Sequence, residues 1–266
     1  GTGFLALGSG LPAGGGTGSG VMNISGGTIN ANTQILVGEN GTGILNVSGS
    51  AFVSVNHATE GLRLAAANTL STGTVNLSGG TILTPIVTKG TGSGYFNFDG
   101  GTLRAKASQA GFIAGLTRAN VRNGGAIIDT GSFNVGISQA LEHSDISGDN
   151  AIDGGLIKNG SGTLTLSAPA NSYTGPTLVN QGGLVLAGNL TATSGLTMAS
   201  GTSLGIRGNV SVGGTVSFNN AGLSFEFNGG TLGALSAGGA VSKTGSNVIN
   251  LTVASGAVSA GISAWG

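Results

Sequence analysis

The sequence predicts an all-β fold, a parallel β-helix made of stacked coils of short strands. Glycine supplies 55 of the 266 residues, charged residues make up 7%, and 39% of the residues are hydrophobic. Disordered chains combine low hydrophobicity with high net charge, whereas the net charge here is zero. The apolar side chains must therefore be buried in an architecture of short strands and many glycine turns.

Composition and pattern exclude several other classes of protein. Collagen needs glycine at every third position and abundant proline, but the chain has 4 prolines and no such period. No apolar run approaches the roughly 18 residues of a membrane span. The absence of cysteine rules out a disulfide framework, and zero net charge argues against a nucleic-acid partner. We expect any signal peptide to have been removed or to lie outside these residues.

One motif, Gly-x-x-Asn-x-Ser/Asp-Gly-Gly/Ser-x-apolar, occurs four times in the first half of the chain. The four units span Gly20–Ile29, Gly43–Phe52, Gly73–Ile82 and Gly94–Leu103. Their anchor asparagines are Asn23, Asn46, Asn76 and Asn97, at spacings of 23, 30 and 21 residues. Periods of about 20–50 residues are typical of solenoids, propellers and arrays.

Each unit alternates polar and apolar residues, as expected for a short strand. The glycine pair that follows predicts a turn, and Thr-Ile or Thr-Leu then begins a second strand. A propeller blade would need about 40–50 residues, so stacked coils fit better. At roughly 20–24 residues per coil, the chain would form on the order of twelve coils.

The second half resembles the passenger-associated transport repeat, also called the autotransporter-associated β-strand repeat. The likeness covers Gly155–Gly188 and rests on Gly155-Leu-Ile-Lys158, Gly160–Leu166, Asn171, Tyr173–Gly175, Thr177 and Gly183–Leu186. This resemblance implies a right-handed β-helix, export from the cytoplasm, and a role at or beyond the outer surface of a bacterial cell. It implies no single activity, because such proteins include adhesins, passive stalks and some enzymes.

Two solenoid segments are expected within one continuous rod. Residues 1–139 would carry the Asn-x-Ser-Gly-Gly repeats and residues 140–266 the transport repeat. The C-terminal translocator typical of an autotransporter is missing from the sequence. Either a longer parent chain or another export route is therefore expected.

The repeated asparagines have two interpretations. Asn-x-Ser/Thr sequons, which are glycosylation acceptors, occur at Asn23, Asn40, Asn46, Asn76, Asn159, Asn189, Asn209 and Asn250. Asparagines at the same point of successive coils would instead stack into a ladder of side-chain amides. We favour the ladder.

The strongest candidate for a ligand site is an acidic cluster. It comprises Glu142, Asp145, Asp149 and Asp153, with His143 beside them. These oxygens are of the kind that Ca²⁺ prefers, but the nonapeptide of calcium-binding β-rolls is missing. Asp153 is more simply a turn residue. We expect no metal and leave calcium binding by the cluster open.

A polysaccharide-acting enzyme is the alternative from another class. Its acidic and basic residues would have to share one face of the rod, and the candidates are Asp99, Asp129, Arg104, Lys106, Arg118 and Arg122. The sequence shows no pair of carboxylates at a defined separation.

His57 and His143 lack recognisable Ser or Asp partners and are expected in solvated loops. Thr163 and Thr165 form a Thr-x-Thr pair that does not recur on every coil, which disfavours ice binding. We therefore predict no catalytic residue, no cofactor and no enzyme activity.

Aromatic residues and charges complete the prediction. Phe96, Phe98, Phe218, Phe225, Phe227 and Trp265 are expected to stack in the core. Residues 1–38 carry no charge, and only Lys243 is charged after Glu226. Solenoid ends expose strand edges that are usually protected by charge. We therefore predict an extracellular structural protein that assembles head to tail into a filament or stalk, and we leave open an adhesive role with glycans or the cell surface as partners. A passive segment of a larger autotransporter-like passenger is a further alternative.

Overall fold

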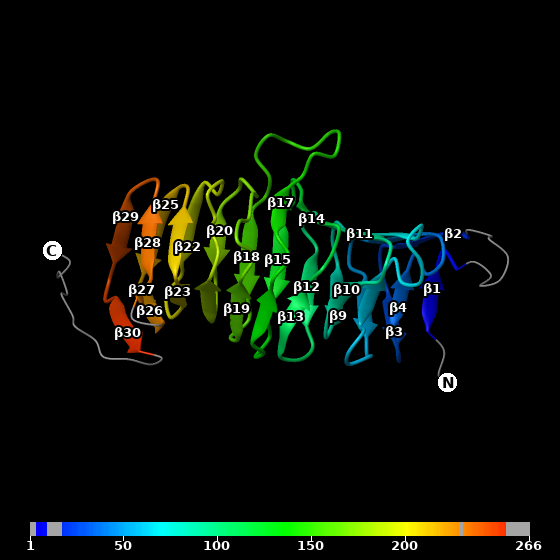
Figure 1. Ribbon diagram of the computed structural model, residues 1–266, viewed down its shortest axis with the longest axis horizontal. Helices are drawn as coiled ribbons and strands as arrows, with labels where there is room; N and C mark the ends of the chain where they lie inside the picture. Colours follow the sequence, from blue (N-terminus) through cyan, green and yellow to red (C-terminus); the bar gives the residue numbers. More distant parts are fainter. Residues whose placement is uncertain (1–3, 10–17, 229–230, 254–266) are drawn as a thin grey trace.

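The computed structural model describes residues 4–9, 18–228 and 231–253. These residues contain no helix, and their strands stack in about ten coils along one axis (Figure 1). The predicted parallel β-solenoid is confirmed. There are fewer coils than expected, partly because the loop 144–153 projects from the rod instead of adding to a coil (Figure 1).

The longest wall of the solenoid, sheet A, follows the whole rod. Its parallel strands, in spatial order, are β1 (Leu5–Leu7), β4 (Ile35–Val37), β7 (Leu62–Leu64), β10 (Val87–Lys89), β13 (Gln109–Ile113), β16 (Val135–Ile137), β19 (Thr163–Leu166), β21 (Gly183–Leu186), β23 (Ser203–Arg207), β26 (Gly222–Asn228) and β30 (Val248–Val253). The short strand β27 (Thr231–Leu232) pairs antiparallel with β26.

A second wall, sheet C, also runs through most of the rod, whereas sheet B stops near its middle. Sheet B consists of β2 (Ser19–Ile24), β5 (Thr42–Val47), β8 (Thr72–Leu77), β11 (Ser93–Phe98), β14 (Arg118–Val121) and β17 (Leu141–His143). Sheet C consists of β3 (Thr28–Ala31), β6 (Phe52–Val55), β9 (Thr81–Thr84), β12 (Thr102–Ala105), β15 (Ala126–Asp129), β18 (Leu156–Asn159), β20 (Thr177–Val179), β22 (Gly195–Met198), β25 (Thr215–Asn219) and β29 (Val241–Thr244). Two further strands, β24 (Asn209–Val212) and β28 (Ala234–Ala237), pair with each other.

The repeated motif builds one corner of each coil. Its first half forms a strand of sheet B, the glycine pair turns the chain, and the second half forms a strand of sheet C. At Gly80 the backbone has a φ of +62°, which glycine adopts without strain. At Gly73 a Cβ atom would lie 2.0 Å from the carbonyl oxygen of Val37, so the backbones can approach this closely only at glycine.

Alternate residues of each wall point into a continuous apolar core. Val75 and Leu77 of sheet B, Ile82 of sheet C and Leu62 of sheet A are fully buried. The predicted core aromatics are confirmed for Phe96, Phe98 and Phe218, and the rings of Phe96 and Phe98 lie 4.4 Å apart. Phe225 is only partly buried. The side chain of Phe227 and all of Trp265 lie outside the described residues.

The predicted asparagine ladder is present on sheet B. Asn23, Asn46, Asn76 and Asn97 are in register on adjacent strands. Each Nδ2 donates to the Oδ1 of the asparagine in the preceding coil, at distances of 2.6–2.7 Å. A fifth member, Asn120, lies outside the four predicted units, and its Nδ2 donates to Oδ1 of Asn97 at 2.7 Å.

The ladder lies on the outer face of the sheet and not in the core. Asn46 alternates with the buried Leu45 and Val47 and is itself partly exposed. Asn97 and Asn120 lie on the same outer face but are 6% and 4% exposed. The amides are therefore satisfied by one another along the rod, with solvent access falling toward Asn120.

Replacing Asn76 by Asp should destabilise the rod, because Asn76 both donates to Asn46 and accepts from Asn97. A carboxylate removes the donor and sets two acceptors against each other, at a cost of about 1–3 kcal/mol. Asn23→Asp is the matched control, because Asn23 serves the ladder only as an acceptor. Chemical denaturation should show a loss for Asn76→Asp and little change for Asn23→Asp. Equal losses would contradict the ladder.

Candidate functional site

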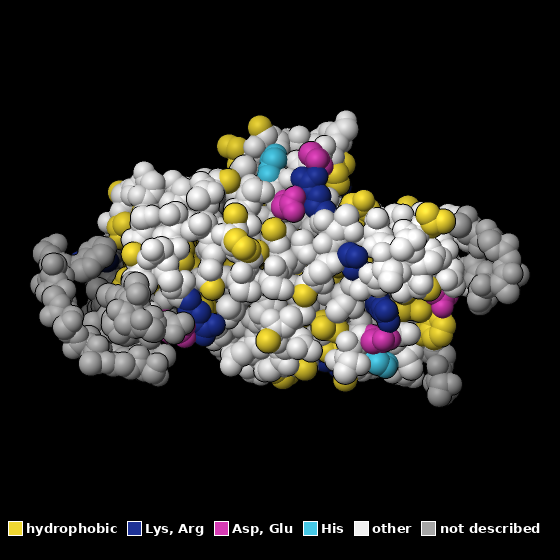
Figure 2. All heavy atoms as spheres, viewed as in Figure 1, with side chains coloured by type: hydrophobic (Ala, Val, Ile, Leu, Met, Phe, Trp, Pro, Cys, Tyr) yellow, Lys and Arg dark blue, Asp and Glu magenta, His cyan; other side chains and the backbone are white. Residues whose placement is uncertain are grey.

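Charged residues gather where sheet B ends. The loop 144–153 connects β17 to β18 and projects from the rod (Figure 1). Figure 2 shows basic side chains between acidic ones at its foot. The ion pairs of this region join the four acids of the predicted cluster and Asp99 to Arg118, Arg122 and His143. Parallel stacking brings the arginines of one coil beside acids about 25 residues later in the chain.

Arg118 neutralises two of the acids. Its Nε lies 3.0 Å from Oε2 of Glu142, and its Nη1 donates to the carboxylate of Asp145. Its Nη2 donates to the backbone oxygen of His143 at 3.0 Å. The hydrogen bond from Arg118 lowers the pKa of Asp145, and the same contact raises the pKa of Arg118. Arg118 therefore fastens the start of the loop to β14.

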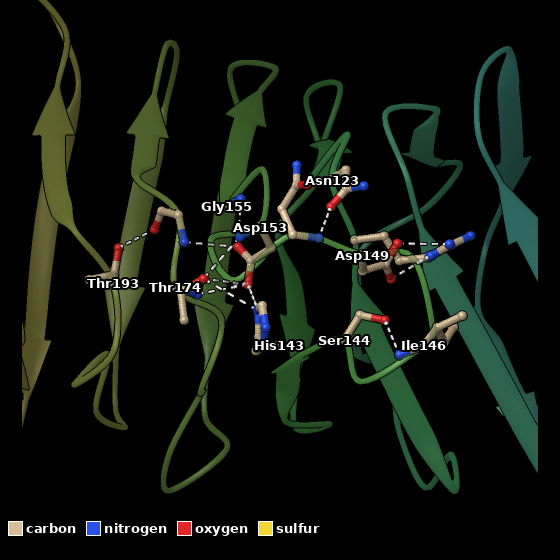
Figure 3. Close-up of polar contacts among 12 residues, drawn as sticks. Asn123, His143, Ser144, Ile146, Asp149, Asp153, Gly155, Thr174 and Thr193 are labelled. Atoms are coloured by element: carbon tan, nitrogen blue, oxygen red, sulfur yellow. Dashed lines mark hydrogen bonds and ion pairs between the residues drawn. The ribbon is translucent and has the colours of Figure 1, made fainter.

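Arg122 holds the middle of the loop. Its Nε and Nη2 donate to the two carboxylate oxygens of Asp149, each at 2.8 Å (Figure 3). Its Nη1 lies 3.7 Å from Asp99 on the preceding coil. The hydrogen bonds from Arg122 lower the pKa of Asp149. The backbone N–H of Asn150 also donates to Asn123 at 2.7 Å.

Asp153 closes the loop and joins it to the following coil. Its buried carboxylate accepts from the backbone N–H groups of Gly155, Thr174 and Gly175 at 2.8–2.9 Å (Figure 3). It also contacts Nδ1 of His143 at 2.8 Å. Burial would raise the pKa of Asp153, but these hydrogen bonds outweigh burial and lower it. The turn role predicted for Asp153 thus extends to a link between coils.

The expectation that His143 is a solvated loop residue without an Asp partner is wrong. His143 ends strand β17, and its ring is held against Asp153. A catalytic triad places the nucleophile and the carboxylate on opposite ring nitrogens. Here the hydroxyl of Thr174 lies 3.3 Å from Nδ1, the nitrogen that faces Asp153, and 3.1 Å from the carboxylate itself. The arrangement positions the histidine without activating Thr174.

The acidic cluster is not assembled as a calcium site. Ca²⁺ takes 6–8 oxygen ligands around one point, whereas Glu142 and Asp145 face Arg118, Asp149 faces Arg122, and Asp153 faces backbone N–H groups. Among the described residues, no group of three or more His, Cys, Asp or Glu side chains is placed to hold a metal ion.

The residues suggested for a polysaccharide-acting face are separated. Arg104 and Asp129 pair at 3.3 Å on sheet C. Arg118, Arg122 and Asp99 lie at sheet B, and Lys106 reaches back to Asn56 and to Ser54. The other histidine, His57, is partly exposed, and its Nδ1 accepts from the N–H of Glu60 at 3.2 Å.

In the coil that follows β17, an irregular segment stands where a strand of sheet B would lie. The N–H of Leu141 in β17 donates to Oδ1 of Asn171, so a side chain stands in for a missing strand. Tyr173 is buried, and its hydroxyl lies 2.6 Å from that of Thr177. Burial raises the pKa of Tyr173. These three polar residues are among those on which the sequence resemblance rests.

Residues 156–186 match the family model of the passenger-associated-transport-repeat. The resemblance seen in the sequence is thereby confirmed. No curated protein and no solved structure matches the chain. The transport repeat is a structural repeat of passenger segments and belongs to no known enzyme family, and it points to a secreted or outer-surface protein. Within the described residues, no helix is long and apolar enough to cross a membrane.

The transport repeat also contains a buried cation that the sequence analysis did not single out. Lys158 is fully buried, and its Nζ, with three N–H donors, lies within hydrogen-bonding distance of four oxygens. These belong to Thr130 in the preceding coil (3.1 Å), to Asn159 and Gly160 in its own coil (3.1 and 2.7 Å), and to Gln181 in the next (2.9 Å). Burial lowers the pKa of Lys158 to about 8, against an opposing effect of Asp129.

The ladder of asparagines ends between β14 and β17, at the foot of loop 144–153. Asn120 faces Glu142 in the next strand, and Oδ1 of Asn120 is buried without a hydrogen-bond partner. A carboxylate has no N–H to offer this acceptor, so the rung cannot be completed.

Glu142→Gln should stabilise the protein by about 1 kcal/mol, because the new amide can donate to Asn120 while its oxygen still faces Arg118. The lost charge costs little, since partly exposed ion pairs contribute about 0–1 kcal/mol. Glu142→Ala, which supplies neither group, is the control. Denaturation curves in which both variants lose equal stability would contradict this account of the ladder's end.

Stability should rise with pH between about 8 and 10 through Lys158. The pKa of Lys158 in the folded protein, about 8, lies below the ordinary lysine value of 10.5, so in this window the unfolded chain binds more protons than the folded chain. At 1.36 kcal/mol per pKa unit, the gain between pH 7 and pH 10 is about 2–3 kcal/mol. Lys158→Met should abolish the rise. A wild-type protein whose free energy of unfolding is flat over this range would refute the assignment.

Proposed function

We propose that this chain is a structural rod segment of an exported, passenger-like protein at or beyond the bacterial outer surface, and that its end coils stack head to tail. The observation that carries the proposal is that sheet A runs as one series of parallel strands from β1 to β30. The transport repeat lies within this wall and supports export. The charged groups around loop 144–153 are taken up in contacts between coils, which favours a structural role over the enzyme alternative.

The end coils support stacking through their free strand edges. Within the described residues, β1, β2 and β3 each have a parallel neighbour on one side only, as do β28, β29 and β30 at the other end. Free edges are templates for pairing with another chain. A head-to-tail contact of this kind need not close and gives an open filament.

Exposed apolar residues gather at the same two ends. Six large hydrophobic side chains are exposed among the described residues, and four of them, Phe4, Val21, Val241 and Val248, lie on the end coils. At the β29–β30 end, an apolar hollow opens between Phe218, Leu223, Val241 and Val248. Covering these residues with a neighbouring coil would remove apolar surface from water.

The isolated chain should sediment as concentration-dependent polymers and form rods in electron micrographs. Val21→Lys and Val241→Lys, each at an exposed position of an end strand, should return it to monomers by placing charge at the stacking faces. Leu70→Lys, at a 79% exposed position away from both ends, is the matched control and should leave assembly unchanged.

The same edges would be covered if the solenoid continued in a longer chain, and the experiment separates the two cases. A wild-type chain that stays monomeric at high concentration would contradict self-assembly and favour continuation. Equal effects of Leu70→Lys and the end variants would show that the polymers form by another surface.

A further inference from the structure

The outer face of sheet A contains a hollow that is separate from the charged site. Its main part lies over β13, β16 and β19 and reaches Arg207 of β23. A second hollow lies on the other side of Arg207, over β21 and β26. Arg207 lines both hollows, and the two together are called the groove.

Stacking in register creates the floor of this groove. The outward positions of successive strands are Gly136, Thr165, Val185, Gly205 and Ser224. Gly205 has no side chain, whereas at Gly136 a Cβ atom would lie 2.2 Å from the carbonyl oxygen of Ala110, so the backbone of β13 covers that position. The ladder between β13 and β16 is also irregular between Gln109 and Ile113, and bulges of this kind re-aim side chains.

The lining offers hydrogen-bonding groups without net charge. Five of the nine residues around the main hollow carry uncharged polar side chains: Ser108, Gln109, Asn134, Thr165 and Ser167. Arg207 is neutralised by Glu226 at 2.6 Å. Ser108 and Asn134 are fixed by backbone N–H groups of Asn134 and Thr163. In the described part of the chain, the side chains of Gln109 and Thr165 make no hydrogen bond, so both remain available to a ligand.

This chemistry selects one class of occupant. A peptide strand would need a free sheet edge, but β16 and β19 under the main hollow are paired on both sides, and β13 is paired with β16 and, at Ile113, with β10. A nucleic acid would need a basic surface, and the single cation here is already paired. We propose that the groove binds an uncharged oligosaccharide lying along the rod, with its hydroxyl groups bonded to Gln109 and Thr165.

The test titrates the isolated chain with cellohexaose, maltohexaose and chitohexaose, using hexagalacturonate as the charged comparison. Calorimetry should show binding of at least one neutral hexasaccharide and none of hexagalacturonate. Thr165→Trp, which fills the groove, and Gln109→Ala should each weaken binding by tenfold or more. Thr197→Trp is the matched control, because Thr197 is an exposed strand threonine on sheet C, and it should leave binding unchanged.

Three results would overturn the assignment: no binding of any neutral hexasaccharide, binding of hexagalacturonate alone, or equal losses for Thr165→Trp and Thr197→Trp. Circular dichroism of each variant separates lost binding from lost folding. Sedimentation is measured separately, so failure of glycan binding and failure of head-to-tail assembly are distinguishable.

Discussion

The whole structure depends on backbone hydrogen bonds between parallel strands that stay in register from coil to coil. Because the register is kept, residues at the same point of successive coils lie directly above one another. Residues in one column must therefore be compatible with their neighbours above and below: asparagines complete one another's hydrogen bonds, and glycines such as Gly73 permit close backbone contact. A column ends at the first residue whose side chain cannot make the contact.

Sheet B shows what happens when a column fails. At Glu142 the amide column meets a carboxylate, and the wall ends one strand later than its last amide. The chain then leaves the rod in loop 144–153 and returns as the transport repeat. Arg118, Arg122 and Asp153 bridge this change of cross-section with charged hydrogen bonds. The charged residues that were candidates for a site in the sequence therefore hold neighbouring coils together.

The sequence predicts those features of the structure that a repeated motif specifies, and it does not predict contacts between residues far apart in the chain. The Asn-x-Ser-Gly-Gly units repeat side chain, turn and spacing together, so the coils and the ladder could be predicted. The glycine pair after Asn120, Gly124 and Gly125, comes one residue later than in the motif, and Thr117 stands where the motif has its first glycine, so only stacking shows that Asn120 belongs to the column. The acids near residue 145 could be found but not interpreted, because their partners lie about 25 residues earlier. His143 was misplaced for the same reason, since its contact with Asp153 spans the whole loop.

Lys158 gives the junction between the two repeat styles a property of its own. Its ammonium group gathers oxygens from three successive coils, as a bound metal ion would. An ion taken from the medium can be removed by chelators or lost where it is scarce. Here the positive charge is covalently attached and occupies a fixed place in the rod. The charge that links these three coils is therefore part of the polypeptide and does not depend on metal ions in the medium.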